Sequence, residues 1–184
     1  MAAPQRNWAA SLLHFWFHKC GPSDWWGGSE RVSAHFQRHY EKWLLALQNQ
    51  PASSFLDDPR TALAALLLFD QAPRNLYSGT ARAFACDPLA LQLCYAIRSR
   101  QWDADFTKAE RQFLGLPLMH SENIADQRES LLYYSHPDLK SSLAFARSHY
   151  AMIARFGRYP HRNPALGRTS TPAEIRAVEA GNSW

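Results

Sequence analysis

Residues 58–75 read DPRTALAALLLFDQAPRN, and this stretch decides the fold class. Asp58 followed by Pro59 is a helix-start signal, because an aspartate side chain accepts bonds from the first free N–H groups and proline suits the first turn. The helix that follows is rich in alanine and leucine, and residues 62–69 are all apolar. A helix that is apolar on nearly all sides belongs in the interior of a protein. We therefore expect it to be central and to stop or kink at Pro73.

Helical periodicity also dominates the chain on both sides of that stretch. Apolar residues recur at intervals of three and four, and no segment alternates strictly enough to be a strand. The other expected helices begin near Trp8, Ser29, Thr80, Asp87, Thr107, Ser121, Leu139 and Thr171. The sequence thus predicts an all-α fold of about eight helices, in one domain spanning residues 1–184.

Local signals predict where several of these helices begin and end. Asp87 stands before a proline and repeats the cap-then-proline signal. Thr107 and Glu110 have the spacing of a capping box. Ser121 is expected to cap the helix after it. Gly157 suits the position just past a helix C-terminus, where a left-handed residue is favoured.

Composition indicates a globular protein without a membrane span. The chain has 184 residues, of which 46% are hydrophobic and 20% charged. Its longest apolar run, residues 62–69, is far shorter than the roughly 20 residues that cross a bilayer. We read no signal peptide. Cys20, Cys86 and Cys94 are odd in number and form no C-x-x-C pair, which suits a reducing cytoplasm and argues against disulfides or a thiolate zinc site.

A second notable stretch, residues 155–168, reads RFGRYPHRNPALGR and contains four arginines, one histidine and no acid. Between residues 139 and 172 every charged side chain is basic, so this segment alone carries the basic excess of a chain with net charge +4. A local excess favours a concentrated anion site over a general affinity for nucleic acid, and we expect no nucleic-acid partner.

The arginines of this stretch allow two interpretations. Arg155, Arg158, Arg162 and Arg168 can neutralise a helix C-terminus and tie loops to carboxylates. Alternatively they form an anion pocket, because the guanidinium fork binds phosphate or carboxylate in a way that lysine cannot reproduce. His161 would then add a charge that switches near neutral pH.

Two further clusters contain residues that can carry chemistry. Asp70 directly follows the apolar run, so its carboxylate needs a partner such as Arg74, or acts as a general base or ligand anchor. His120 precedes the expected helix start at Ser121, which favours a capping role over acid/base chemistry oriented by Glu122. His149 lies midway along a helix and is more typical of a core or groove histidine.

Metal and cofactor sites are not expected. His14 with His18, and His35 with His39, have the i,i+4 spacing of zinc ligands, but no third ligand is evident. Arg38 beside the second pair would also oppose a cation. The sequence contains no P-loop, dinucleotide fingerprint, nucleophile elbow or kinase motif set.

The chain resembles a known bacterial family across nearly its whole length. The residues that carry the resemblance are Phe15-Trp16-Phe17, Phe69-Asp70-Gln71, Pro73-Arg74-Asn75, Phe84, Asp87, Pro117-Leu118, His120-Ser121-Glu122, Gln127, His149, Arg155 to Asn163 and Leu166-Gly167-Arg168. They are similar to the uncharacterised domain-of-unknown-function family numbered 924. The chain departs from the family pattern at His18, Ala72 and Ser78. The resemblance implies a tetratricopeptide-like, right-handed array of antiparallel helices, and it brings no established activity.

These observations lead to three functional hypotheses. The first is a pocket for a small phosphate- or carboxylate-bearing ligand, in which a histidine could serve hydrolytic chemistry. The second is a non-enzymatic module that binds peptides in a groove. The third is a purely structural network of ion pairs. The residues expected to line the site are Asp70, Arg74, His120, Glu122, Gln127, His149, Arg155, Arg158, His161 and Arg162.

Overall fold

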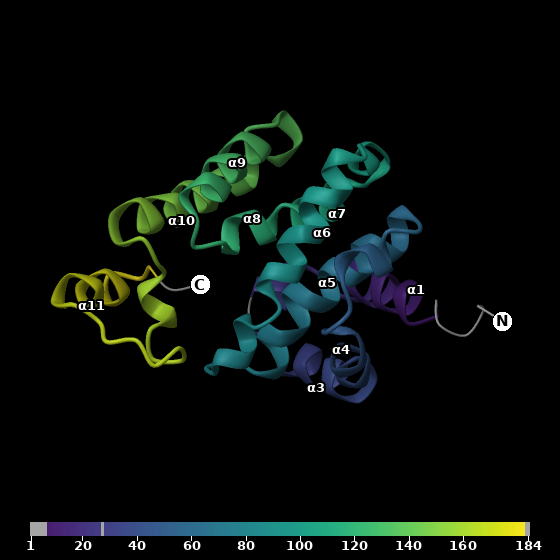
Figure 1. Ribbon diagram of the computed structural model, residues 1–184, viewed down its shortest axis with the longest axis horizontal. Helices are drawn as coiled ribbons and strands as arrows, with labels where there is room; N and C mark the ends of the chain where they lie inside the picture. The colour runs from purple at the N-terminus through teal and green to yellow at the C-terminus, as the bar shows by residue number, and fades with distance from the viewer. Residues whose placement is uncertain (1–6, 27, 183–184) are drawn as a thin grey trace.

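The computed structural model describes residues 7–26 and 28–182, and every regular element within them is a helix (Figure 1). The α-helices are α1 Asn7–His14, α2 Pro22–Trp26, α3 Glu30–His39, α4 Glu41–Leu47, α5 Pro59–Leu76, α6 Asp87–Ser99, α7 Lys108–Leu114, α8 Leu116–His120, α9 Ile124–Tyr134, α10 Leu143–Phe156 and α11 Pro172–Glu179. The prediction of an all-α protein is confirmed.

The described residues form more helices than the eight or so expected. One expected helix is divided at Tyr40, whose backbone leaves the helical region between α3 and α4. The short helices α2 and α8 are also present, and neither is among the helices that the sequence analysis expected. Periodicity over a long window does not detect single turns of this kind.

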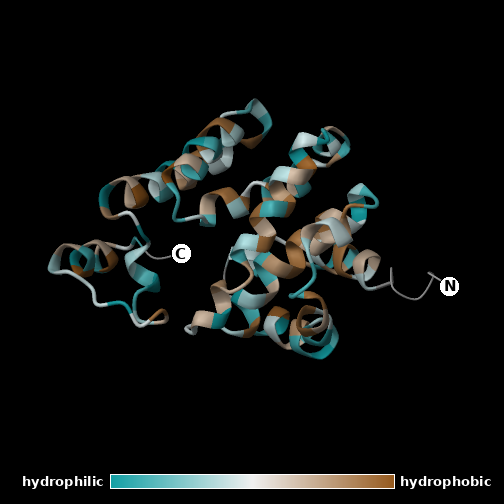
Figure 2. Ribbon diagram, viewed as in Figure 1, coloured by the Kyte–Doolittle hydropathy of each residue, from teal (hydrophilic) through white to brown (hydrophobic). Residues whose placement is uncertain are grey.

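Helix α5 is the centre of the fold, as its composition predicts. All its residues from Ala62 to Pro73 are buried, and α1, α3 and α6 pack against it (Figure 1). In Figure 2 the hydrophobic colour runs along this central helix. Its start is also confirmed, because the Asp58 carboxylate accepts bonds from the N–H groups of Arg60 at 3.0 Å and Thr61 at 2.9 Å.

Helix α5 does not stop at Pro73 but continues to Leu76. Proline removes one backbone donor from the helix interior. Side chains bond to carbonyls of the same turn: Arg74 Nη1 donates to the Asp70 carbonyl at 2.7 Å, and Asn75 Nδ2 donates to the Gln71 carbonyl at 2.9 Å. The added turn therefore carries Arg74 on the same helix as Asp70.

Most of the predicted helix ends are confirmed. Thr107 and Glu110 form a reciprocal capping box at the start of α7. Gly157 follows α10 with a φ of 69°, in the left-handed region that favours glycine. The prediction that Asp87 caps α6 is wrong, because Cys86 occupies the cap position and the Asp87 carboxylate lies in the first turn of the helix. That carboxylate is free to pair with side chains elsewhere.

The prediction that Ser121 caps the next helix is wrong. Helix α9 begins at Ile124, and its cap is Asn123, whose Oδ1 accepts a bond from the N–H of Ala125 at 2.8 Å. Ser121 Oγ instead donates to Asp126 Oδ2 at 2.6 Å. Serine and asparagine are both good caps, so composition alone does not choose between them.

The chain after α10 forms a smaller unit with its own apolar cluster. Met152, Ile153, Tyr159 and Ala177 are buried together, separately from the main core. Figure 1 shows this C-terminal segment returning from the end of α10 and leading into α11. Polar contacts join it to the rest of the molecule, and they lie at the site described next.

Candidate functional site

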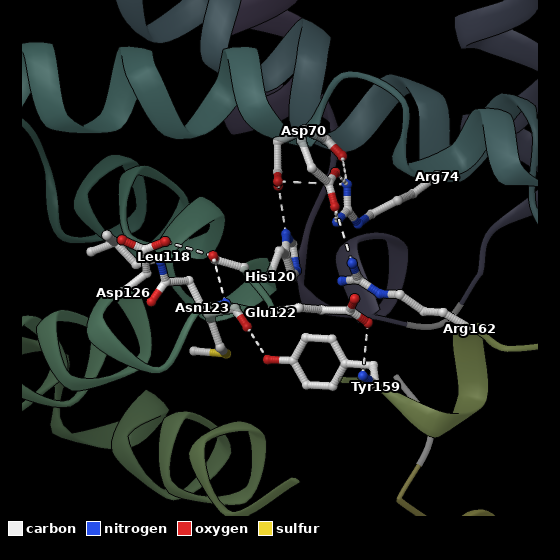
Figure 3. Close-up of polar contacts among 12 residues, drawn as sticks. Asp70, Arg74, Leu118, His120, Glu122, Asn123, Asp126, Tyr159 and Arg162 are labelled. Atoms are coloured by element: carbon white, nitrogen blue, oxygen red, sulfur yellow. Dashed lines mark hydrogen bonds and ion pairs between the residues drawn. The ribbon is translucent and has the colours of Figure 1, made fainter. Parts of the chain in front are cut away.

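The site is organised around a buried carboxylate on α5 that meets a histidine at the end of α8. Asp70 is fully buried, and its Oδ1 lies 2.7 Å from Nδ1 of His120 (Figure 3). Its other oxygen, Oδ2, accepts a bond from Gln71 Nε2 at 2.6 Å. The His120 side chain keeps 15% of its surface exposed, and its Nε2 makes no hydrogen bond to any described residue. The pair therefore consists of a buried carboxylate and a histidine whose side chain is partly exposed.

The protonation of this pair follows from the contacts. Burial alone would raise the pKa of the Asp70 carboxyl, but the contacts with His120 and Arg74 outweigh burial and lower the pKa to about 2. Burial and the Arg74 charge also lower the pKa of His120, against the opposing effect of Asp70. An ionised carboxylate only accepts hydrogen bonds. Nδ1 of a neutral His120 is therefore the donor, and Nε2 carries the lone pair.

Two arginines share one further carboxylate beside this pair. Arg74 binds Asp87 with both of its terminal nitrogens, at 2.7 and 3.0 Å, and its Nη1 lies 3.6 Å from Asp70 Oδ1. Arg162, from the C-terminal segment, reaches Asp87 Oδ2 with Nη1 at 3.2 Å. The Arg74 and Arg162 guanidiniums thus face the same carboxylate from α5 and from the C-terminal segment.

The Arg162 guanidinium is held between two aromatic rings. Its central carbon lies 4.5 Å from the ring centre of Phe84 and 4.7 Å from that of Tyr159. Arg162 is only 6% exposed, and its Nε is buried without a hydrogen-bond partner. Burial and the like charge of Arg74 lower the pKa of Arg162.

Glu122 anchors the C-terminal segment. Its carboxylate accepts two bonds from Arg168, at 2.7 and 2.9 Å, and one from the backbone N–H of Tyr159 at 2.7 Å. Burial alone would raise the pKa of Glu122, but these bonds outweigh it and lower the pKa. The Glu122 carboxylate is therefore occupied within the protein.

Gln127 is fully buried and ties α8 to Tyr159. Its Nε2 lies within hydrogen-bond distance of the carbonyls of Leu118, Met119 and Ser121 and of the Tyr159 hydroxyl. Because carbonyls at a helix C-terminus have no partner within the helix, the amide closes the end of α8. His120 is the last residue of that helix, so Gln127 acts on the site through the backbone that carries His120.

Two more predicted residues, His149 and His161, lie against the ring of Tyr159. The ring centres are 5.6 Å apart for His149 and 5.5 Å apart for His161. His149 Nδ1 also donates to the Phe145 carbonyl at 2.8 Å. Burial is the main cause that lowers their pKa values, to about 3 for His149 and about 4 for His161. Both rings are therefore neutral near pH 7.

The remaining predicted residues, Arg155 and Arg158, do not join the cluster. Arg155 is exposed and lies over the ring of Phe156, at 4.8 Å from its centre. Arg158 binds both oxygens of Glu174 on α11, at 2.7 and 2.9 Å, and donates to the carbonyl of Thr169. The structure thus brings together Asp70, Arg74, His120 and Arg162, with Glu122, Gln127, His149 and His161 around Tyr159.

Comparison with known proteins identifies the family. Residues 12–182 match the bacterial protein family of unknown function DUF924. The chain belongs to this family. It is also similar to the solved structure of ATU0120, a protein of unknown function from Agrobacterium tumefaciens. That protein is 34% identical with a TM-score of 0.87, over 94% of this chain and 97% of the other. No curated protein matches the chain.

This DUF924 chain places residues at the site that the sequence analysis did not select. Asp87 was interpreted as a helix cap, and Arg168 was considered with the other arginines of the basic stretch, but neither was placed among the residues lining the site. Phe84 and Tyr159 contact the Arg162 guanidinium. Tyr159 belongs to the basic stretch itself, but Phe84 is far from Arg162 in sequence, so no local sequence pattern predicts its contact.

We also considered cavities, metal-binding groups and membrane-spanning helices elsewhere on the DUF924 chain. Two cavities open to solvent, of about 360 and 310 Å³, lie against α3 and α4 and include none of the predicted site residues. The described residues contain no group of three or more His, Cys, Asp or Glu side chains suited to a metal ion. None of their helices is both long and apolar enough to cross a membrane.

Proposed function

We propose that this protein is an enzyme of acid/base chemistry, in which His120 acts as the base on a small anionic substrate. The observation that carries the proposal is the contact of 2.7 Å between the buried Asp70 carboxylate and Nδ1 of His120. A carboxylate in this position sets the tautomer and the orientation of an imidazole, and it stabilises the imidazolium formed when the base takes a proton. His120 Nε2 is the atom that would exchange that proton.

The electrostatics of the site support the role of His120 as a base. Its pKa is lowered by burial and by Arg74, so the ring is unprotonated near pH 7 and ready to accept a proton. No serine, threonine or cysteine in the described part of the chain hydrogen-bonds to His120. A hydrolytic reaction here would therefore use water as its nucleophile, activated by Nε2.

The structural hypothesis is favoured for part of the basic stretch. Arg158 is paired with Glu174 and Arg168 with Glu122, each through two hydrogen bonds. Bidentate pairs of this kind hold segments together and leave little capacity for a ligand. We therefore confine the ligand-binding role to the guanidiniums beside His120 and assign Arg158 and Arg168 to the docking of the C-terminal segment.

We also propose that the helices form a tetratricopeptide-like array and that the protein works in the cytoplasm. Neighbouring helices such as α9 and α10 lie side by side, which supports the tetratricopeptide-like array implied by the family resemblance. Cys20, Cys86 and Cys94 are all free thiols, which supports a reducing compartment such as the cytoplasm.

Turnover of a panel of small anionic substrates tests the proposed function. The panel holds chromogenic phosphate monoesters together with esters and amides that carry a carboxylate, each assayed with wild type and His120→Asn. We expect at least one substrate to be hydrolysed and His120→Asn to lose about 100-fold in rate, the typical contribution of a general base. His136→Asn is the matched control, because His136 is a surface residue with 49% of its side chain exposed.

The dependence of rate on pH adds an independent readout. The rate should rise with pH as His120 deprotonates, and the midpoint of the rise should lie below the ordinary histidine pKa of about 6.5. Turnover that is unchanged in His120→Asn would refute the assignment, and so would the absence of turnover across the whole panel.

A further inference from the structure

The hydrogen-bonding capacity of Arg162 is only partly used. A guanidinium has five N–H donors in a planar fork. Arg162 makes one ion pair, from Nη1 to Asp87 at 3.2 Å, and its Nε is buried with no partner. Its Nη2 makes no hydrogen bond to the described residues. A buried charge normally has its donors satisfied, so this side chain lacks an acceptor.

Arg158 shows what the same edge of a guanidinium binds in this protein. Arg158 uses Nε and Nη2 to hold the two oxygens of Glu174, at 2.7 and 2.9 Å. Nε and Nη2 are the donors that remain unused on Arg162. A group with two oxygens spaced as in a carboxylate or a phosphoryl group fits this edge.

Asp87 cannot fill this role itself. Both of its oxygens already accept bonds from Arg74, at 2.7 and 3.0 Å, and Oδ2 accepts a third and longer bond from Arg162 Nη1, at 3.2 Å. The carboxylate is 17% exposed and lies between the two cations. It therefore acts as an internal anion that accepts two bonds from Arg74 and one from Arg162.

We propose that Arg162 binds the oxyanion group of a small ligand through Nε and Nη2, with Asp87 as an internal anion that weakens this binding. The rings of Phe84 and Tyr159, with centres 4.5 and 4.7 Å from the central carbon of the guanidinium, restrict its movement. Figure 3 shows Arg162 and His120 extending from different elements toward the region of Asp70. The inference deepens the proposed function by naming the residue that recognises the anionic group, and it does not depend on His120 chemistry.

Binding of two simple anions to the full chain tests this inference. Inorganic phosphate and acetate are titrated separately and followed by calorimetry, with wild type, Arg162→Lys and Asp87→Asn. We expect at least one anion to bind, and the preferred one separates a phosphoryl ligand from a carboxylate ligand. Arg162→Lys should weaken binding at least about tenfold, because lysine keeps the charge and loses the fork. Asp87→Asn should tighten binding by a similar factor, because it removes the competing charge.

The gain in Asp87→Asn keeps the test informative even if Arg162→Lys is unstable, because an unfolding defect does not tighten binding. Arg155→Lys is the matched control, since Arg155 is exposed and lies outside the cluster. Equal affinity in wild type and Arg162→Lys would overturn the inference, as would no binding of either anion to wild type and Asp87→Asn. His120→Asn separates the two proposals, because it should lose turnover and keep anion binding.

Discussion

Replacing Gln127 with leucine should destabilise the protein by about 2 kcal/mol, a value that follows from the contacts of one amide. Gln127 is fully buried, and its Nε2 shares two hydrogens among three carbonyls and the Tyr159 hydroxyl. Each net hydrogen bond contributes about 1 kcal/mol, and a buried acceptor left without a partner costs about 1–3 kcal/mol. In Gln127→Leu the Met119 carbonyl still accepts a bond from the Tyr159 hydroxyl. The Ser121 carbonyl, at 2.7 Å from Nε2 in wild type, loses its bond to Gln127, and this lost bond accounts for most of the destabilisation.

The unpaired oxygen of Gln127 keeps this value low. Oε1 is buried without a partner, so leucine also removes an unsatisfied acceptor and offsets part of the cost. Urea unfolding followed by circular dichroism measures the change in the free energy of unfolding. Gln92→Leu is the control, because Gln92 is exposed on α6 and should change stability by less than about 0.5 kcal/mol. If Gln127→Leu is as mild as this control, the amide does not close the end of α8.

Three further predictions concern other parts of the structure. Gly115→Ala should cost about 1–3 kcal/mol in urea unfolding, because an added Cβ would lie 2.6 Å from the Tyr133 ring; wild-type stability would contradict the packing between α7 and α9. His149 has its pKa lowered to about 3, so the unfolded chain binds its proton first and stability falls as pH drops below about 6.5. Between pH 6.5 and 5 the His149 share of this loss is about 2 kcal/mol, so His149→Gln should lose less stability than wild type by this amount when urea unfolding is compared at both pH values, while His161, whose pKa is also lowered, keeps its own share. Arg158→Ala should speed hydrogen exchange in α11 by releasing Glu174, and unchanged anion affinity in the same variant would show that Arg158 holds α11 and not a ligand.

The sequence predicted the parts of the fold that depend on neighbours along the chain. The start of α5 at Asp58, the capping box of Thr107 with Glu110, and the glycine after α10 each involve residues within one helical turn. The expected stop at Pro73 is wrong, since α5 continues to Leu76, and the propensity of proline to end a helix does not show when surrounding contacts let the helix continue.

The sequence was less informative about the site, because its contacts join distant residues. Asp70 and His120 are separated by 50 positions, and Asp87 and Arg162 by 75. Asp70 was expected to need a cationic partner, and Arg74 supplies one, but the stronger contact with His120 had no local signal. For Asp87, in contrast, a local signal was present but pointed to a different role. Its place before a proline explained it as a helix start, and this local explanation concealed its pairing with two arginines.

The two kinds of arginine in the C-terminal segment explain how one basic stretch can serve both structure and binding. Arg158 and Arg168 each bind both oxygens of an acidic partner within the protein, so their charges are compensated before any ligand arrives. Their pairs hold the segment against α11 and against Glu122, and the segment in turn carries Arg162 to the side of His120. If the Glu122 pair is broken, Arg162 loses its support, and anion affinity should fall even though Glu122 itself repels anions. Phosphate and acetate affinity should therefore be measured in Glu122→Gln and Asp87→Asn side by side. We expect Glu122→Gln to weaken binding, because Glu122 positions Arg162, and Asp87→Asn to strengthen binding, because Asp87 competes with the ligand for Arg162.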